Sequence, residues 1–586
     1  MTLTKDDRDR LESAVRRARR LLEEDFREVL EGRFGIHLSG RVEDDAAVKL
    51  SDSDRAARRE LLGILNHFRS LGLSPKEGAG RLLREAVFTT LNRLLAIRLS
   101  EAIGLLPESL ARGKDSQGFR EFLEVFPLLA KDVHGGYWTY LRLCADELAR
   151  DAPVLFDPRN PLLVIEPSPV TLDDLLDILT DEALAGVWGH AETLGWAYQY
   201  FVSQEERRAA REEQAPRNSQ ELAVRNQWFT PRYVVDFLVH NTLGRRLVEA
   251  GHDLTEHLPM LVDRPARGSR RLELEDVRVL DPAVGSGHFL LGCYDVLERA
   301  WEQAGVPPEK SASRILPCLW GVDIDPRCAQ VAAAALILRA RRRCRQEDLP
   351  RPRIITARAL PGDKRAWEAV LQEVDGGLRE VLSAVGDTLR DAPVLGSLLK
   401  VEEVLRSAIH RVAGLPTRGI FTDEQVLAQY RDVEQRVLEA LARVARETQA
   451  SAAERLFAAE TMDALRFVEA MQQRYDAVLM NPPFGEPVPQ TKEYLKAAYP
   501  WIAWKDYNLL APFVGRGIQL LREGGYLGAI TSRAGLFLTT FEAWRKDVLL
   551  RHRLVVLADL GHGVMEGAMV EAAAYVVGAE ARRRGE

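Results

Sequence analysis

Cysteine is scarce in this chain of 586 residues, and none of the five cysteines forms a Cys-x-x-Cys pair. A disulfide framework and a cysteine zinc site are therefore not expected, and a reducing compartment fits. Long apolar runs are also missing: the longest, around 331–338, is far shorter than the ~18 residues that suggest a membrane span. The charged first twenty residues contain no apolar signal core, so we expect a cytoplasmic protein without a membrane partner.

An excess of positive charge is missing as well, because 80 Lys and Arg stand against 87 Asp and Glu, for a net charge of −7. This balance argues against a protein that coats nucleic acid by bulk charge, although it is compatible with a local basic cleft. Only 12 of the basic residues are lysine. Arginine suits phosphate contacts, but a composition bias of the genome explains the excess equally well.

The hydrophobic pattern changes character near residue 220. Before it, apolar residues recur at helical spacing, apart from proline-bounded apolar runs over 153–169 that predict a short hairpin. After it, short β-branched runs alternate with helical segments, which predicts an α/β fold with a mostly parallel, doubly wound sheet. The expected strands lie at 277–280, 319–322, 354–356, 477–479, 526–530, 554–558 and 573–577.

Five parts are expected along the chain. They are a mainly helical N-terminal domain (1–204), a charged linker (205–220), the cofactor-binding half of a Rossmann-like core (221–361), a helical insertion (362–470) and the catalytic half of the core (471–586).

The first segment that indicates chemistry runs from Asp281 to Gly287 and reads Asp-Pro-Ala-Val-Gly-Ser-Gly. An apolar strand leads into this turn and a helix follows it. Glycines let the backbone approach a ligand, and a helix N-terminus presents free N–H groups. The third glycine of the dinucleotide fingerprint is missing, so the turn by itself is also compatible with a purely structural role.

The second segment is Gly-Val-Asp323-Ile324-Asp-Pro at the end of the next expected strand. An acid at this place in a doubly wound sheet accepts hydrogen bonds from the ribose hydroxyls of a nucleoside, and Ile324 is placed to cover an adenine ring. An acidic helix cap is the alternative. Together the two segments favour a ligand that contains adenosine.

The third segment is Asn481-Pro482-Pro483-Phe484, directly after an apolar strand. The prolines fix the backbone and remove two N–H donors. The turn therefore presents the Asn481 amide oxygen and the Pro482 carbonyl as acceptors beside an aromatic face. This combination suits an aromatic amine, whose two N–H groups the acceptors can hold while Phe484 stacks on the ring.

The order of these three segments resembles that of the gamma group of DNA methyltransferases, which methylate the exocyclic nitrogen of adenine. The upstream stretch 226–235, Asn-Gln-Trp-Phe-Thr-Pro-Arg-Tyr-Val-Val, looks like the additional cofactor segment of that family. The resemblance covers about 190–580. More narrowly, the helical N-terminal part, the phrase at 356–363 and the run at 529–535 resemble the large methylases of the BREX and class 1 DISARM phage-defence systems.

The resemblance implies an enzyme that transfers a methyl group from S-adenosylmethionine to adenine in double-stranded DNA. It implies a cofactor site formed by Phe229, Thr230, Pro231, Asp281, Pro282, Gly285, Ser286, Gly287, Asp323, Ile324 and Asn481. It implies that Asn481, Pro482, Pro483 and Phe484 hold the target adenine. The family often has an acid after the third strand, but the comparable stretch here is Ala357–Leu360, with Asp363 as a loose substitute.

No metal is expected, because the sulfonium already makes the methyl group electrophilic and the enzyme mainly has to position the reactants. Cations and aromatic residues alternate after the catalytic turn, which suits phosphate contact and base stacking. The residues expected to contact DNA are Lys492, Tyr494, Lys505, Tyr507 and Arg533. A partly buried aromatic patch under a loop is the alternative interpretation of the stretch 492–507.

Other functions remain open at this point. Turns of the Asn-Pro-Pro-Phe type also occur in enzymes that methylate RNA bases or protein glutamine, and a methylase fold can serve as a cofactor- and DNA-sensing subunit of a defence complex. None of the lysines lies in a Glu-x-Lys triplet, so a common nuclease site is not expected. Only a short polar tail follows the expected strand at 573–577. We therefore expect the chain to be either a fragment or one subunit of a split enzyme, with partner subunits of the defence system supplying most of the target recognition.

Overall fold

The computed structural model divides the chain into two compact units. The first unit comprises 1–201, 360–379 and 421–462, and the second comprises 202–359, 380–420 and 463–586. The residues that the structure describes are 3–202, 204–212, 215–226, 228, 230–266, 268, 271–345, 348–360, 376–412, 428, 432, 435–436, 452–501, 508–565 and 570–581. Phe229, Asp363, Lys505 and Tyr507, all named in the expectations above, lie outside them.

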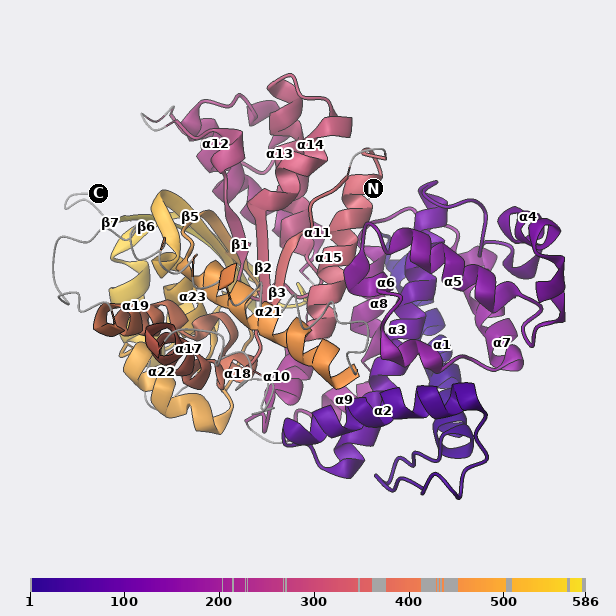
Figure 1. The fold of residues 1–586 in the computed structure, drawn as a ribbon. Coiled ribbons are helices and arrows are strands. Elements are labelled where there is room, and N and C mark those ends of the chain that lie inside the picture. The colour runs from indigo at the N-terminus through magenta and orange to yellow at the C-terminus, as the bar shows by residue number, and fades with distance from the viewer. Residues whose placement is uncertain are drawn as a thin grey trace. The chain divides into compact units, whose positions relative to one another are not determined.

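Helices form the first unit, as the apolar spacing predicts (Figure 1). Those in residues 3–201 are α1 (Lys5–Glu28), α2 (Asp52–Ser70), α3 (Pro75–Ala102), α4 (Gln117–Val125), α5 (Tyr137–Leu148), α6 (Pro153–Phe156), α7 (Pro169–Leu179) and α8 (Thr193–Phe201). Capping boxes at Thr4 and Ser74 start α1 and α3, because each side chain accepts a hydrogen bond from the third backbone N–H of its helix.

The hairpin expected over 153–169 is wrong. Pro153 begins α6, and Pro161 begins the short 3₁₀ helix Pro161–Val164. Proline is favoured at the first position of a helix, where its missing N–H has no partner to lose. The prolines that bound these apolar runs therefore start helical turns here, and they do not interrupt strands.

The sheet lies in the second unit and confirms the expected α/β fold. Its strands are β1 (Val279–Asp281), β2 (Leu319–Asp323), β3 (Arg353–Thr356), β4 (Tyr475–Met480), β5 (Leu521–Ser532), β6 (His552–Gly561) and β7 (Ala572–Ala581). In the described residues they form one seven-stranded sheet in the order β3-β2-β1-β4-β5-β7-β6. All neighbouring pairs are parallel except those of β7, which runs antiparallel to β5 and β6.

Helices flank the sheet on both faces. Those described in residues 202–581 are α9 (Gln204–Ala209), α10 (Ser219–Arg225), α11 (Arg232–Val239), α12 (Arg245–Ala250), α13 (His288–Gln303), α14 (Pro308–Ile315), α15 (Pro326–Arg341), α17 (Gly376–Leu389), α18 (Ala392–Leu395), α19 (Val401–Val412), α21 (Ala452–Gln472), α22 (Lys492–Ala498), α23 (Leu510–Gln519), α24 (Ala534–Phe537) and α25 (Glu542–Trp544). A Cβ placed on Gly517 of α23 would touch Leu527, whereas one placed on Gly528 would touch Thr242. Because consecutive strand residues point to opposite faces, α23 and the segment after α11 cover opposite sides of β5.

Topology decides where the site lies. β1 pairs with β2 and β4 in parallel, so the carboxyl ends of these three strands meet at one edge of the sheet. Asp281 ends β1, Asp323 ends β2 and Asn481 follows β4. The order of strands reverses between β1 and β4, which is where ligands bind in open α/β sheets. In Figure 1, β1, β2 and β3 lie side by side in the centre of the view.

Helices form in the described parts of both the expected linker and the expected insertion, and the insertion is divided between the two units. The expected linker 205–220 overlaps α9 and the start of α10, and its Ala210 forms a small buried cluster with Val202 and Val224. The described residues of the expected insertion 362–470 are largely helical. No helix in the described part of the chain is both long and apolar enough to cross a membrane.

Candidate active site

The glycine turn has the backbone geometry that its sequence demands. Gly285 and Gly287 have φ angles of 51° and 87°, a region that favours glycine. A Cβ on Gly287 would also lie 3.1 Å from the Cβ of Ala332, so the turn packs closely on α15. Gly287 caps α13, which leaves the first N–H groups of that helix at the carboxyl edge of the sheet.

Two carboxylates line this turn. Asp281 is buried and accepts a hydrogen bond from Ala283 N at 3.1 Å. The Asp323 carboxylate accepts hydrogen bonds from Gly285 N at 2.8 Å and Asp325 N at 2.9 Å. The end of β2 is thereby tied to the glycine turn, and the structure brings together the two segments that the sequence assigned to an adenosine ligand.

Burial dominates the electrostatics of these acids. It raises the pKa of Asp281 well above its ordinary value, and the charge of Asp323 raises it further. Burial likewise raises the pKa of Asp323 to about 7, although the backbone N–H groups of Asp325 and Gly285 oppose the shift. Burial lowers the pKa of His288 to about 3, so this imidazole is neutral near pH 7. Strongly shifted groups that gather at one sheet edge are typical of functional sites.

Asn481 lies across from this turn with its amide already oriented. Its Nδ2 donates to the Trp228 carbonyl and to Thr230 Oγ1, both at 3.2 Å, and lies 3.6 Å from the Met565 sulfur. Its Oδ1 is buried and has no hydrogen-bond partner among the described residues. A buried acceptor without a partner is costly, so this oxygen is available to a donor from outside the described residues.

The Asn-Pro-Pro-Phe turn is also held by two other asparagines. Phe484 N donates to Asn226 Oδ1 at 2.7 Å, and Gly485 N donates to Asn508 Oδ1 at 3.2 Å. Neither asparagine is among the site residues expected from the sequence. Asn226 lies in the stretch compared with a cofactor segment, but only the tertiary contact shows what its amide does.

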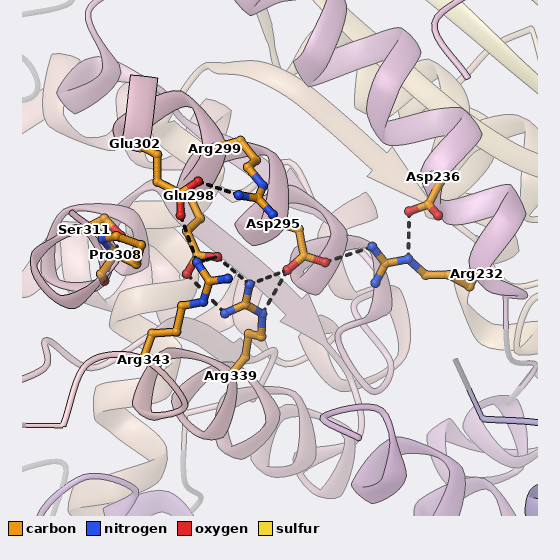
Figure 2. Close-up of polar contacts among 10 residues, drawn as sticks. All are labelled: Arg232, Asp236, Asp295, Glu298, Arg299, Glu302, Pro308, Ser311, Arg339 and Arg343. Carbon is orange, nitrogen blue, oxygen red and sulfur yellow. Dashed lines mark hydrogen bonds and ion pairs between the residues drawn. The ribbon is translucent and has the colours of Figure 1, made fainter. Parts of the chain in front are cut away.

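The stretch around Thr230 is anchored through the helix that follows it. Arg232 at the start of α11 bonds Asp236 at 2.7 Å and Asp295 of α13 at 2.8 Å. Asp295 also binds Arg339 of α15, which in turn bonds the buried Glu298 at 2.8 Å (Figure 2). This network joins three helices, and it fixes α11 relative to the helix that the glycine turn begins.

The network stabilises the charged form of its central arginine, Arg339. Burial by itself lowers the pKa of Arg339, but its hydrogen bonds with Glu298 and the charge of Asp295 outweigh burial and raise the pKa above its ordinary value. Paired and hydrogen-bonded, these charges can remain ionised in a largely dry environment.

A segment of the expected insertion reaches the glycine turn and the end of β2. Ser397 Oγ donates to the Pro282 carbonyl at 2.9 Å, and a Cβ on Gly396 would lie 3.0 Å from Ile324 Cγ2. Arg516 of α23 holds this segment, because it bonds the Ser397 carbonyl at 3.1 Å and forms a buried ion pair with Glu402 at 2.6 Å. Residues 396–402 therefore support Ile324 from one side.

Several side chains expected to contact DNA already have partners within the chain. Tyr494 accepts a hydrogen bond from Lys400 N at 2.8 Å, and buried Tyr499 donates to the Leu398 carbonyl at 2.7 Å. These tyrosines match the alternative of a partly buried aromatic patch. Lys492 pairs with Glu486 at 2.7 Å, and Arg533 pairs with Glu571 at 3.2 Å and Asp559 at 3.3 Å. DNA contact by Lys492 and Arg533 stays a prediction.

The known proteins to which this chain is similar include a restriction-modification methylase family and two adenine-specific methyltransferases. Residues 317–564 match the Eco57I restriction-modification methylase family. The chain is 26% identical over 553 residues to the adenine-specific methyltransferase BrxX of Escherichia coli O9:H4 (strain HS), and this match covers 86% of the chain and 44% of the relative. It is 24% identical over 597 residues to the adenine-specific methyltransferase PglX of Lacticaseibacillus casei (strain Zhang), covering 91% of the chain and 46% of the relative.

The expected resemblance to adenine-specific methyltransferases is confirmed. The chain spans about half the length of the two curated relatives. Among solved structures, it is similar to DrdV in complex with DNA, at a TM-score of 0.44 and 13% identity over 98% of this chain and 42% of DrdV. It is also similar to the type IIL restriction-modification enzyme MmeI in complex with DNA, at a TM-score of 0.42 and 13% identity over 90% of this chain and 57% of MmeI.

Proposed function

We propose that this chain is the methyltransferase part of an adenine-specific DNA methyltransferase of a phage-defence system of the BREX or DISARM kind. It would transfer the methyl group of S-adenosylmethionine to the exocyclic nitrogen of adenine. The observation that carries the proposal is the Asn481 amide, whose nitrogen is engaged by Trp228 and Thr230 while its buried oxygen has no partner. The two curated relatives, both named as adenine-specific methyltransferases, support it.

The residues present fit S-adenosylmethionine. The positive-φ glycine turn and the start of α13 offer N–H groups at the sheet edge, and Asp323 supplies a carboxylate at the end of the neighbouring strand. Within the described residues, no group of three or more His, Cys, Asp or Glu is arranged to hold a metal ion. We therefore assign the cofactor to Thr230, Asp281, Gly285, Asp323 and Ile324.

The chain's own part in the reaction is positioning and charge stabilisation. When bound, the sulfonium supplies an electrophilic methyl group. Asn481 Oδ1 and the Pro482 carbonyl accept the two N–H bonds of the adenine amine, which turns its lone pair out of conjugation with the ring. The same acceptors stabilise the positive charge that develops on nitrogen. Phe484 stacks on the base, which must leave the DNA stack to reach this turn.

A partner supplies most of the sequence specificity in this proposal. The chain spans about half the length of its curated relatives, and its described cations near the catalytic turn are largely ion-paired. Phosphate contacts alone give salt-sensitive binding with little sequence information. The specific assay therefore needs the chain together with the other proteins of its defence system.

The test compares Asn481→Ala with a matched control, Asn160→Ala, which removes an asparagine cap from a helical turn of the other unit. In the presence of the other proteins of the defence system, transfer of labelled methyl groups is measured on duplex DNA, RNA and protein. Cofactor affinity of the chain itself is measured by calorimetry. We expect Asn481→Ala to retain cofactor binding and to lose about 10²–10³-fold in methyl transfer to DNA. Full activity of Asn481→Ala on DNA refutes the mechanism, and activity on RNA or protein in place of DNA refutes the substrate.

A further inference from the structure

Three hydrogen bonds connect the stretch 226–230 directly to the catalytic turn. The Asn226 amide oxygen accepts from Phe484 N at 2.7 Å. The Trp228 carbonyl and Thr230 Oγ1 both accept from Asn481 Nδ2 at 3.2 Å. The stretch that precedes α11 thus touches both the residue proposed to act on the amine and the residue proposed to stack on the base.

The orientation of Asn226 is itself fixed. Its Nδ2 donates to the Leu222 carbonyl at 2.9 Å, and its backbone N donates to the Ala223 carbonyl at 3.1 Å where it caps α10. With Nδ2 engaged by its own helix, Oδ1 must face Phe484. The helix is held in turn by Arg225, which donates to the Ala215 carbonyl at 3.1 Å.

Few backbone N–H groups are available to orient the catalytic turn. Pro482 and Pro483 have no N–H, so Phe484 and Gly485 carry the first backbone donors after Asn481. Both donate to asparagine side chains, Phe484 to Asn226 and Gly485 to Asn508. The Gly485 carbonyl also accepts from Leu509 N at 2.9 Å, so three described hydrogen bonds orient this backbone. Loss of the Asn226 oxygen would remove the one that holds the Phe484 N–H.

We propose that Asn226 is a positioning residue that couples the cofactor segment to the catalytic turn. A ligand that orders Thr230 and Pro231 also orders Asn226, and Asn226 then fixes the backbone of Phe484 in the position for base stacking. The inference rests on the proposed function, because that function places the cofactor at Thr230. It implies that the cofactor prepares the turn before the target base arrives.

Amide hydrogen exchange measures this coupling without any methyl transfer. Phe484 and Gly485 are the only exchangeable amides between Asn481 and Glu486, so fragmentation of a peptide over this turn resolves them. In the wild-type chain, saturating S-adenosylmethionine should slow exchange of the Phe484 amide about two- to tenfold, the range that one ordinary hydrogen bond supports.

Three variants test whether Asn226 causes the slowing of Phe484 amide exchange. Asn226→Ala should speed Phe484 exchange without cofactor and abolish the slowing with cofactor. Asn226→Asp keeps an acceptor oxygen and should restore the slowing. Asn218→Ala is the matched control, because Asn218 caps the other end of α10 through Glu221 N and has no described contact with the turn. It should behave like the wild type.

Reciprocity gives a second readout. If the cofactor strengthens the bond between Asn226 and Phe484, then Asn226→Ala must weaken cofactor affinity by up to the same factor. Equal Phe484 exchange in wild type and Asn226→Ala overturns the inference, as does slowing that persists in Asn226→Ala. No cofactor binding by calorimetry refutes the proposed function and the coupling together, whereas binding without slowing refutes the coupling alone.

Discussion

Ionisation of Asp323 should control cofactor affinity near neutral pH. Burial raises the pKa of this carboxyl to about 7, whereas its ordinary value is 3.8. The ionised form can accept hydrogen bonds from two ribose hydroxyls, but the protonated form has lost part of that capacity. Only about a tenth of a group with a pKa of 7 is ionised at pH 6, so wild-type affinity for S-adenosylmethionine should fall about tenfold between pH 8 and pH 6.

Asp323→Asn should remove this dependence and weaken binding at pH 8 by about 10- to 100-fold, because hydrogen bonds to a charged acceptor are worth about 1.5–3 kcal/mol. Calorimetry at pH 6, 7 and 8 measures both proteins. Titration of the ligand is common to the two, so the ratio of their affinities isolates Asp323. An affinity ratio that stays constant across this pH range would show that the carboxylate does not bind the ribose.

Asp323→Asn should weaken cofactor binding, but at pH 8 it should not reduce the stability of the folded chain. Moving the pKa of the carboxyl from 3.8 to about 7 costs its ionised form about 4 kcal/mol. The folded protein then binds more protons than the unfolded chain between these values, so this contribution to stability falls as pH rises through that window. Asp323→Asn avoids this cost because it has no ionised form. Its amide cannot accept from both Gly285 N and Asp325 N, however, and the lost hydrogen bond costs the variant about 1–3 kcal/mol of stability. The unfolding temperature of the variant should therefore match or exceed that of the wild type at pH 8 and lose the advantage at pH 5.

Three further predictions concern other parts of the site. Arg339→Met should destabilise the chain by about 3–5 kcal/mol in chemical denaturation, because it leaves buried Glu298 without its main partner, and adding Glu298→Met should recover most of the loss; a single variant as stable as the wild type contradicts the network. Phe484→Ala should weaken productive base capture by about 1–3 kcal/mol, seen as a raised KM for DNA with unchanged cofactor affinity. The purified chain alone should bind S-adenosylmethionine yet methylate DNA weakly, and robust methylation of one defined motif by the isolated chain would show that no partner is needed.

Local patterns were enough to place the strands and the three chemical segments. The runs before Asp281, Asp323 and Asn481 are apolar and bounded by turn residues, and each forms a strand of the sheet. A glycine turn with positive φ and a pair of prolines constrain only their own backbone, so their geometry follows from the residues themselves. The sequence therefore determined the sheet, and parallel pairing then brought these segments to one edge.

Tertiary structure alone decided the partners within that edge. Asn226 and Phe484 are 258 residues apart, and Trp228 and Asn481 are 253 apart, so no local pattern links them. The hydroxyl of Tyr494 bonds Lys400 N, although its spacing among cations suited a DNA contact equally well. A side chain's partner depends on which distant backbone group folding brings within reach of it, and at these separations only the packed fold determines that.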